Sequence, residues 1–157
     1  MTAPPIKDAL GRPAIELAGV TGPDAFSTLG SGLILLGTEF GTGQATASVI
    51  ANEYGQVDRV PFPIAWERWD ILAYDTAGAA LAISAVVDVL ATTYATNSFA
   101  SIAGTDLPTL ASAPKNTSIL LTGWTLSNPA DTMYRFKLVS FTGSPAKIVV
   151  GIRGFAT

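Results

Sequence analysis

Apolar and charged residues alternate with a period of two near the end of the chain. The run 132–141 shows it in Tyr134, Arg135, Phe136, Lys137 and Leu138. The run 146–155 alternates in the same way. Such alternation is typical of a strand with one buried face. The short linker 142–145 contains Gly, so it predicts that the two strands pair as a hairpin.

Five further segments are predicted as strands: 31–40, 44–51, 64–75, 81–90 and 118–122. Segment 64–75 also has helical spacing at Trp66, Trp69 and Ala73, but its period-two alternation and its aromatic residues favour a strand. Residues 53–56 are predicted as a turn. Seven or eight short strands separated by turn residues indicate an all-β fold, an antiparallel β-sandwich of jelly-roll type.

The segment 91–117 is a long polar connection between two of these strands. Connections of this length are unusual inside a compact domain unless they carry a contact or a short helix.

Residues 1–31 differ from the rest in composition, because four prolines and four glycines interrupt them. Proline restricts the backbone and favours an extended course, so the segment predicts an extended arm. A terminus of this kind can also be disordered, and docking on a neighbouring chain would order it. We therefore divide the chain into an arm, 1–31, which we expect to be a docking segment, and a β-sandwich domain, 32–157.

The low charge of the chain points to burial against other subunits. Charged residues make up 13% of the 157 residues and hydrophobic residues 48%. Typical globular proteins carry about 25% charged residues. A surface built from Ser, Thr, Gly and Ala is the alternative explanation.

Charge and hydropathy argue against two classes of partner. The nine Lys and Arg residues are scattered and the net charge is −3, which argues against nucleic-acid binding. The longest apolar stretch, 77–87, is shorter than the roughly 20 residues that a bilayer span needs. Met1–Asp8 lacks the apolar region of a secretory signal. We expect neither nucleic acid nor membrane insertion.

The chain contains no His and no Cys. This excludes thiolate chemistry and the Ser-His-Asp triad, and it removes the commonest metal ligands. We therefore expect no metal site and no cofactor. A glycosidase would need two carboxylates across a cleft. Folding could bring Glu67 to Asp75 or Asp70 to Asp88, but the spacing favours no pair, so we expect that the protein is not an enzyme.

Five aromatic residues are candidates for stacking on sugar rings: Trp66, Trp69, Trp124, Tyr54 and Tyr74. Each could equally pack in the core or in a subunit interface. Trp66 adjoins Glu67 and shares the period-two side of Arg68, so we expect it to be the most exposed Trp. Trp66 and Arg68 are the candidate glycan contacts.

The order of features over about 65–155 is distinctive. A strand ends in Trp69-Asp-Ile-Leu-Ala-Tyr-Asp75. The stretch Ser101-Ile-Ala-Gly-Thr-Asp-Leu-Pro-Thr-Leu110 follows, and then Gly123-Trp124 and two alternating strands. This order resembles β-rich virion domains of tailed bacteriophages, which occur in tail fibres, head or vertex fibres and capsid decoration proteins. The resemblance implies a jelly-roll-like domain that is often trimeric and that assembles on the particle or binds a host surface.

The arm adds to this resemblance. Residues 4–13 are similar to the short openings that tie phage fibre and tail proteins to the particle. Pro4, Pro5, Ile6 and Arg12 are therefore the candidate assembly residues. No stalk of repeats follows, which favours a compact spike, cap or decoration subunit over a whole fibre.

The leading hypothesis is a phage virion structural protein whose partners are itself, as a homotrimer, and other virion proteins. The alternative is a carbohydrate- or host-receptor-binding module of a phage tail, whose partner is a host-surface glycan. A small glycan hydrolase is the third hypothesis.

Overall fold

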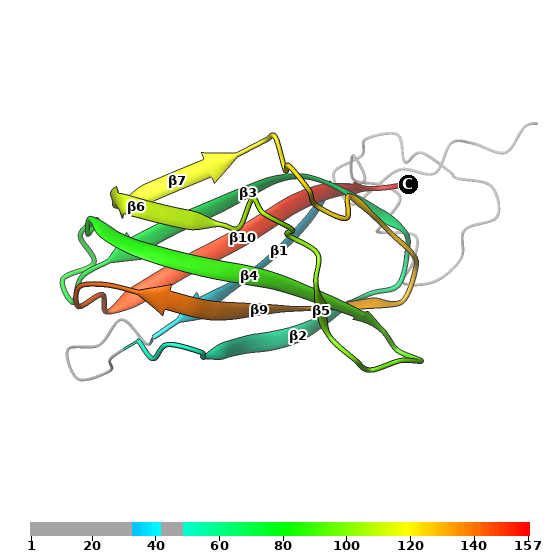
Figure 1. The fold of residues 1–157 in the computed structure, drawn as a ribbon, viewed down its shortest axis with the longest axis horizontal. Coiled ribbons are helices and arrows are strands. Elements are labelled where there is room, and N and C mark those ends of the chain that lie inside the picture. Colours follow the sequence, from blue (N-terminus) through cyan, green and yellow to red (C-terminus); the bar gives the residue numbers. More distant parts are fainter. Residues whose placement is uncertain (1–32, 42–48) are drawn as a thin grey trace, which may run out of the picture. The chain divides into compact units, whose positions relative to one another are not determined.

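The computed structural model describes residues 33–41 and 49–157, and the regular structure in them is all β (Figure 1). The strands are β1 (Leu33–Phe40), β2 (Tyr54–Val60), β3 (Ile64–Tyr74), β4 (Ile83–Thr93), β5 (Ala100–Ser101), β6 (Thr109–Ala113), β7 (Lys115–Ser118), β8 (Ser127–Asn128), β9 (Thr132–Phe141) and β10 (Lys147–Ala156). In this part of the chain there is no helix that could span a membrane.

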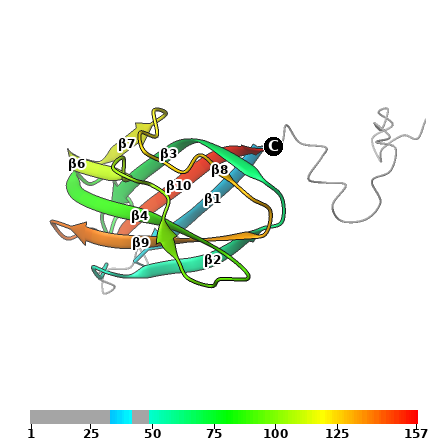
Figure 2. The same ribbon diagram turned by 45° about the vertical axis from the view of Figure 1, so that its right-hand side comes forward.

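The strands form two antiparallel five-stranded sheets, seen as two layers in Figures 1 and 2. Sheet I has the order β1-β10-β3-β7, with β8 also paired to β3. Sheet II has the order β2-β9-β4-β5, with β6 also paired to β4. The predicted all-β antiparallel sandwich is confirmed.

The pairing follows the nested scheme of a jelly roll. The outermost pair is β1 with β10, and inside it lie β2 with β9, β3 with β7 and β8, and β4 with β5 and β6. Successive pairs alternate between the two sheets, as they do when one long antiparallel ribbon is rolled up. The first and last described strands are therefore neighbours.

The predicted hairpin of the last two long strands is wrong. Both are strands, but β9 lies in sheet II and β10 in sheet I. The linker crosses between the sheets and is bonded to each. Thr142 N–H donates to Ser84 O of sheet II (2.8 Å), and Ala146 N–H donates to Tyr74 O of sheet I (2.9 Å). Alternation identifies a half-buried strand but does not say which sheet it joins.

Four other segments differ from expectation. Residues 54–56, predicted as part of a turn, begin β2. The predicted strand 118–122 contributes only its first residue, because Leu121 has a positive φ of 45° and strand geometry ends before it. The connection 91–117 holds β5, β6 and part of β7 rather than a helix. Of the predicted strand 44–51, residues 44–48 lie outside the described part, and 49–51 form no strand.

Both sheets contribute their inner faces to one hydrophobic core. Its largest fully buried side chains are Phe40, Ile64, Ile71, Leu110, Tyr134, Phe136, Leu138, Ile148 and Ile152. Trp66 of sheet I meets Tyr134 of sheet II edge to face, with ring centroids 5.1 Å apart. Burial raises the pKa of Tyr134 to about 12, although Thr132 and Trp66 oppose the shift. The phenol is therefore neutral at physiological pH.

Candidate interaction surfaces

A β-bulge in β3 decides where the tryptophans point. Arg68 pairs with Arg153, but the next partner, Gly154, pairs with Trp66, so Glu67 is an extra residue. An extra residue reverses the period-two pattern beyond it. Trp66 and Trp69 therefore both face the core, and each is 3% exposed. The expectation that Trp66 is the exposed Trp is wrong.

Gly154 makes room for this inward indole. A Cβ placed on Gly154 would lie 2.8 Å from Cε3 of Trp66, closer than real Cβ contacts allow. Trp124 is also buried, and its Nε1 donates to the backbone oxygen of Asp106 (2.8 Å). All three tryptophans are thus core residues, and a buried ring presents no face to a sugar.

Arg68 lies on the outer face of sheet I and is held by its neighbour Asp70. Its Nε and an Nη donate to the two carboxylate oxygens at 2.8 and 2.6 Å. A glycan contact of Arg68 remains a prediction. The candidate assembly residues Pro4, Pro5, Ile6 and Arg12 lie outside the described residues.

The outer face of sheet I carries a shallow open hollow of about 400 Å³. Gly37 of β1 and Gly151 of β10 lie opposite each other in register and leave its floor without side chains. Leu35, Leu72 and Val149 also line it. The hollow is therefore largely apolar.

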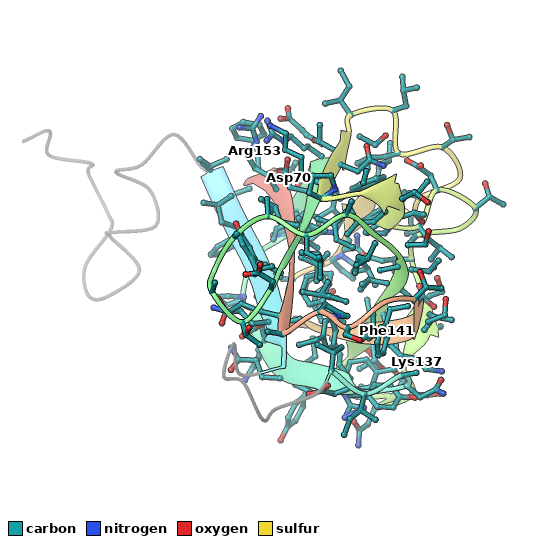
Figure 3. The ribbon with its side chains drawn as sticks, turned by 90° about the vertical axis from the view of Figure 1, so that its left-hand side faces the viewer. Asp70, Lys137, Phe141 and Arg153 are labelled. Atoms are coloured by element: carbon teal, nitrogen blue, oxygen red, sulfur yellow. The ribbon has the colours of Figure 1, made fainter. Side chains whose placement is uncertain are left out.

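The charges on this face are paired with one another. Besides Arg68 with Asp70, the ion pairs are Lys147 Nζ to Glu39 (3.2 Å) and an Nη of Arg153 to Glu67 (3.9 Å). Figure 3 shows Asp70 and Arg153 close together, away from Lys137. Burial raises the pKa of Asp70, but hydrogen bonds from Arg68 and Thr117 and the nearby positive charges lower it more, so the net pKa lies below its usual value.

Residues of β1 line this hollow. Strand β1 is the edge strand of sheet I and lies beside β10 (Figure 2). Its outward side chains include Leu33 and Leu35, which are 42% and 69% exposed. Within the described residues, β10 is the only strand that pairs with β1. An edge strand with exposed apolar side chains is a ready surface for pairing with another chain.

A second apolar projection follows β7. Ile119 and Leu120 are 74% and 81% exposed. The next residue, Leu121, is buried, and its carbonyl accepts a hydrogen bond from Trp124 N–H (3.1 Å). The projecting pair is therefore anchored to the core at its base.

The outer face of sheet II has a different character, because cations stack on aromatic rings. The guanidinium carbon of Arg135 lies 4.7 Å from the ring centre of Tyr54 and 5.0 Å from that of Phe99. Lys137 Nζ lies 5.6 Å from the Tyr54 centre. In register, Tyr54, Lys137 and Asp88 form one row across three strands. Asp88 also accepts a hydrogen bond from the Ser101 hydroxyl (2.6 Å).

The carboxylate pairs considered for catalysis are not formed. Asp70 is on the outer face of sheet I, whereas Asp88 is on that of sheet II. Asp75 Oδ1 accepts the N–H groups of Ala77 (2.8 Å) and Ala79 (2.9 Å) in a turn. Within residues 33–41 and 49–157, no three acidic side chains gather as a metal site would require.

The sequence predicts Tyr54 as a candidate for sugar stacking, but it assembles neither of the two surfaces that the fold creates. The alternation in 132–141 did place Arg135 and Lys137 on one side of a strand. Their aromatic partner Tyr54 was assigned to a turn, so the stacked cluster could not be assembled. The exposed edge at Leu35 gives no local signal, because an apolar run looks the same at an edge and in the middle of a sheet.

No family model matches the chain, and no curated protein matches it in sequence. Among solved structures, a chain of the cyanophage Pam1 capsid asymmetric unit is similar over 91% of this chain and 94% of its own, at 14% identity and a TM-score of 0.35. A chain of infectious bursal disease virus, Gx strain, is similar over 98% of this chain and 42% of its own, at 7% identity and a TM-score of 0.34.

The catalytic domain of a GH87 α-1,3-glucanase in complex with nigerose is similar over 82% of this chain and 27% of its own, at 12% identity and a TM-score of 0.32. Two of these three chains thus come from viruses and one from an enzyme. At these TM-scores the likenesses assign neither a family nor a function.

Proposed function

We propose that the protein is a structural subunit of a phage virion, of the decoration, spike or fibre kind, which acts by assembly. The observation that carries this proposal is the exposed apolar edge of sheet I. Leu35 is 69% exposed beside a largely apolar hollow. The resemblance of residues 65–155 to phage virion domains supports the same role.

This surface is suited to burial in an interface. Transferring a leucine side chain from water to an apolar contact contributes about 1.5–3 kcal/mol. Its charged neighbours are already in ion pairs, so a partner covering this face meets few unpaired charges. A covering strand could also pair with the side of β1 that is paired with none of the described strands.

The assembly that we propose is a homotrimer located on the virion. Residues 1–31 directly precede β1 in the chain, and we propose that this arm docks on other virion proteins through Pro4, Pro5, Ile6 and Arg12. A jelly-roll domain with a docking arm needs no catalytic site for such a role.

Static light scattering on the full chain tests this proposal. We expect three times the monomer mass at micromolar concentration. Deleting residues 1–31 should weaken attachment to partner virion proteins, and it should reduce the mass if the arm also links the subunits. The proposal would be contradicted if the full chain is monomeric at micromolar concentration and if deleting residues 1–31 lowers the measured mass only by the mass of those residues.

The second candidate is a carbohydrate- or receptor-binding module. Trp66 no longer supports it, since that ring is buried. One other observation favours it, namely the exposed ring of Tyr54 beside Arg135 and Lys137 on sheet II.

A further inference from the structure

The outer face of sheet II holds two cations without acidic partners in the described part of the chain. Arg135 and Lys137 take part in none of the ion pairs formed by residues 33–41 and 49–157. Both are stabilised by aromatic rings instead. Stacking supports a guanidinium from its faces and leaves donors at its edge available.

The guanidinium of Arg135 is held in place before any ligand arrives. The side chain contacts Tyr54 and Phe99, which come from different strands or loops. Its Nε is buried and has no hydrogen-bond partner among the residues that the structure describes. A planar donor fixed in this way loses little freedom when it binds a carboxylate through two parallel hydrogen bonds.

Two further groups complete the surface. The Tyr54 side chain is 49% exposed, so part of its ring is open to a ligand. Asp88 lies next to Lys137 in register and adds a carboxylate that can accept hydrogen bonds from hydroxyl groups. An aromatic ring, cationic donors and a carboxylate acceptor therefore lie on one face.

We infer that this face binds an acidic saccharide, with its carboxylate on Arg135 and Lys137, its ring against Tyr54 and a hydroxyl donating to Asp88. The apolar C–H face of a sugar ring suits Tyr54, and sugar hydroxyls suit Asp88. A polyacidic peptide would satisfy the cations, but it has no hydroxyl to offer Asp88 and no apolar ring face for Tyr54. This binding does not depend on the proposed assembly.

Isothermal titration of the full chain with trigalacturonate tests the inference, with maltotriose as the neutral probe and a short polyglutamate as the acidic peptide. We expect trigalacturonate to bind and the other two to bind at least about tenfold more weakly. Arg135→Ala and Tyr54→Ala should each weaken binding about tenfold, the equivalent of one charge-assisted or stacking contact. Arg153→Ala, on sheet I, is the matched control and should leave the affinity unchanged.

Thermal unfolding of each variant shows whether it is folded. Arg135→Lys keeps the charge but loses the planar fork, and an intermediate affinity would support the proposed carboxylate contact. Absence of trigalacturonate binding, equal binding of polyglutamate, or equal weakening by Arg153→Ala would overturn the inference. None of these results would bear on the mass measured by light scattering.

Discussion

The two outer faces of the sandwich share one core but hold most of their cations differently, although Arg59 on sheet II is also paired with a carboxylate, that of Asp131 (2.7 Å). On sheet I, the cations Arg68, Lys147 and Arg153 are each paired with a carboxylate. On sheet II, Arg135 and Lys137 rest on aromatic rings. Figure 3 shows the labelled residues of the two groups in separate parts of the molecule.

This difference separates two kinds of recognition. A face whose charges are already paired can be covered by an apolar partner at little electrostatic cost, which suits permanent assembly. A face with cations held on rings keeps donors available for an incoming anion, which suits a ligand. One jelly-roll domain can therefore combine assembly on one side with recognition on the other.

The largest expected effect tests the core that both faces share. Trp66→Ala should destabilise the domain by about 3–5 kcal/mol, because a large buried aromatic side chain is removed. Chemical denaturation followed by fluorescence or circular dichroism measures it. The neighbouring Glu67→Ala is the control and should change stability by less than about 0.5 kcal/mol, since Glu67 is exposed at the bulge. Similar losses for both variants would mean that the bulge does not turn Trp66 inward.

The second prediction breaks the assembly face alone. Leu35→Asp should raise the dissociation constant of the assembly about 100-fold, because it places a charge where apolar surface is buried. Val57→Asp introduces the same charge on sheet II, where Val57 is 43% exposed, and should leave assembly intact. Sedimentation velocity over a dilution series distinguishes them. If both variants dissociate the assembly to the same extent, sheet I cannot be distinguished from sheet II as the assembly face.

The third prediction concerns the stability of the stacked cluster. Arg135→Ala should cost about 1–2 kcal/mol, because it removes two cation–π contacts. Arg153→Ala, which loses a long ion pair of 3.9 Å and a positive charge near Asp70, should cost less than about 0.5 kcal/mol, because both interactions are at the surface. Equilibrium denaturation in urea measures both variants. A larger loss for Arg153→Ala would show that ion pairing on sheet I contributes more than stacking on sheet II.

The smallest effect is a dependence of stability on pH that comes from sheet I. The pKa of Asp70 is lowered in the folded state, so its ion pair stabilises the fold above the unfolded pKa of about 3.9. That contribution is lost as the pH falls through the lower folded value. The stability difference between the wild type and Asp70→Asn should therefore shrink between pH 6 and pH 3. A difference that stays constant over this range would contradict the role of Asp70.

Local patterns predicted the strands better than their partners. Alternation found β9 and β10, because half-burial leaves a period of two in the sequence. It placed them in one hairpin, because the choice of sheet depends on backbone hydrogen bonds of the linker to Ser84 and Tyr74. The jelly-roll class could be predicted from the number and spacing of strands, whereas the sheet of each strand could not.

The candidate site was harder to predict, for two physical reasons. One extra residue, Glu67, turns Trp66 to the same side as Trp69. The resulting three-residue spacing also fits a helix, so the pattern alone does not identify a bulge. The Arg135 cluster depends on residues that lie far apart in sequence. Tyr54 on β2 and Phe99, just before β5, meet Arg135 on β9 only once the sheet order β2-β9-β4-β5 has formed. Both features arise from pairing and not from local sequence.

Labelling of introduced cysteines tests the central claim most directly, because the chain contains none of its own. Leu35→Cys marks the edge of sheet I and Val57→Cys the face of sheet II, two positions that are exposed in the isolated domain. We predict that, at micromolar protein concentration, a maleimide reagent labels Val57→Cys rapidly and Leu35→Cys slowly. Diluting the protein, or adding the substitution Leu33→Asp, should abolish the protection of Leu35→Cys. Equally rapid labelling of both positions at every concentration would contradict the claim that sheet I is the assembly face.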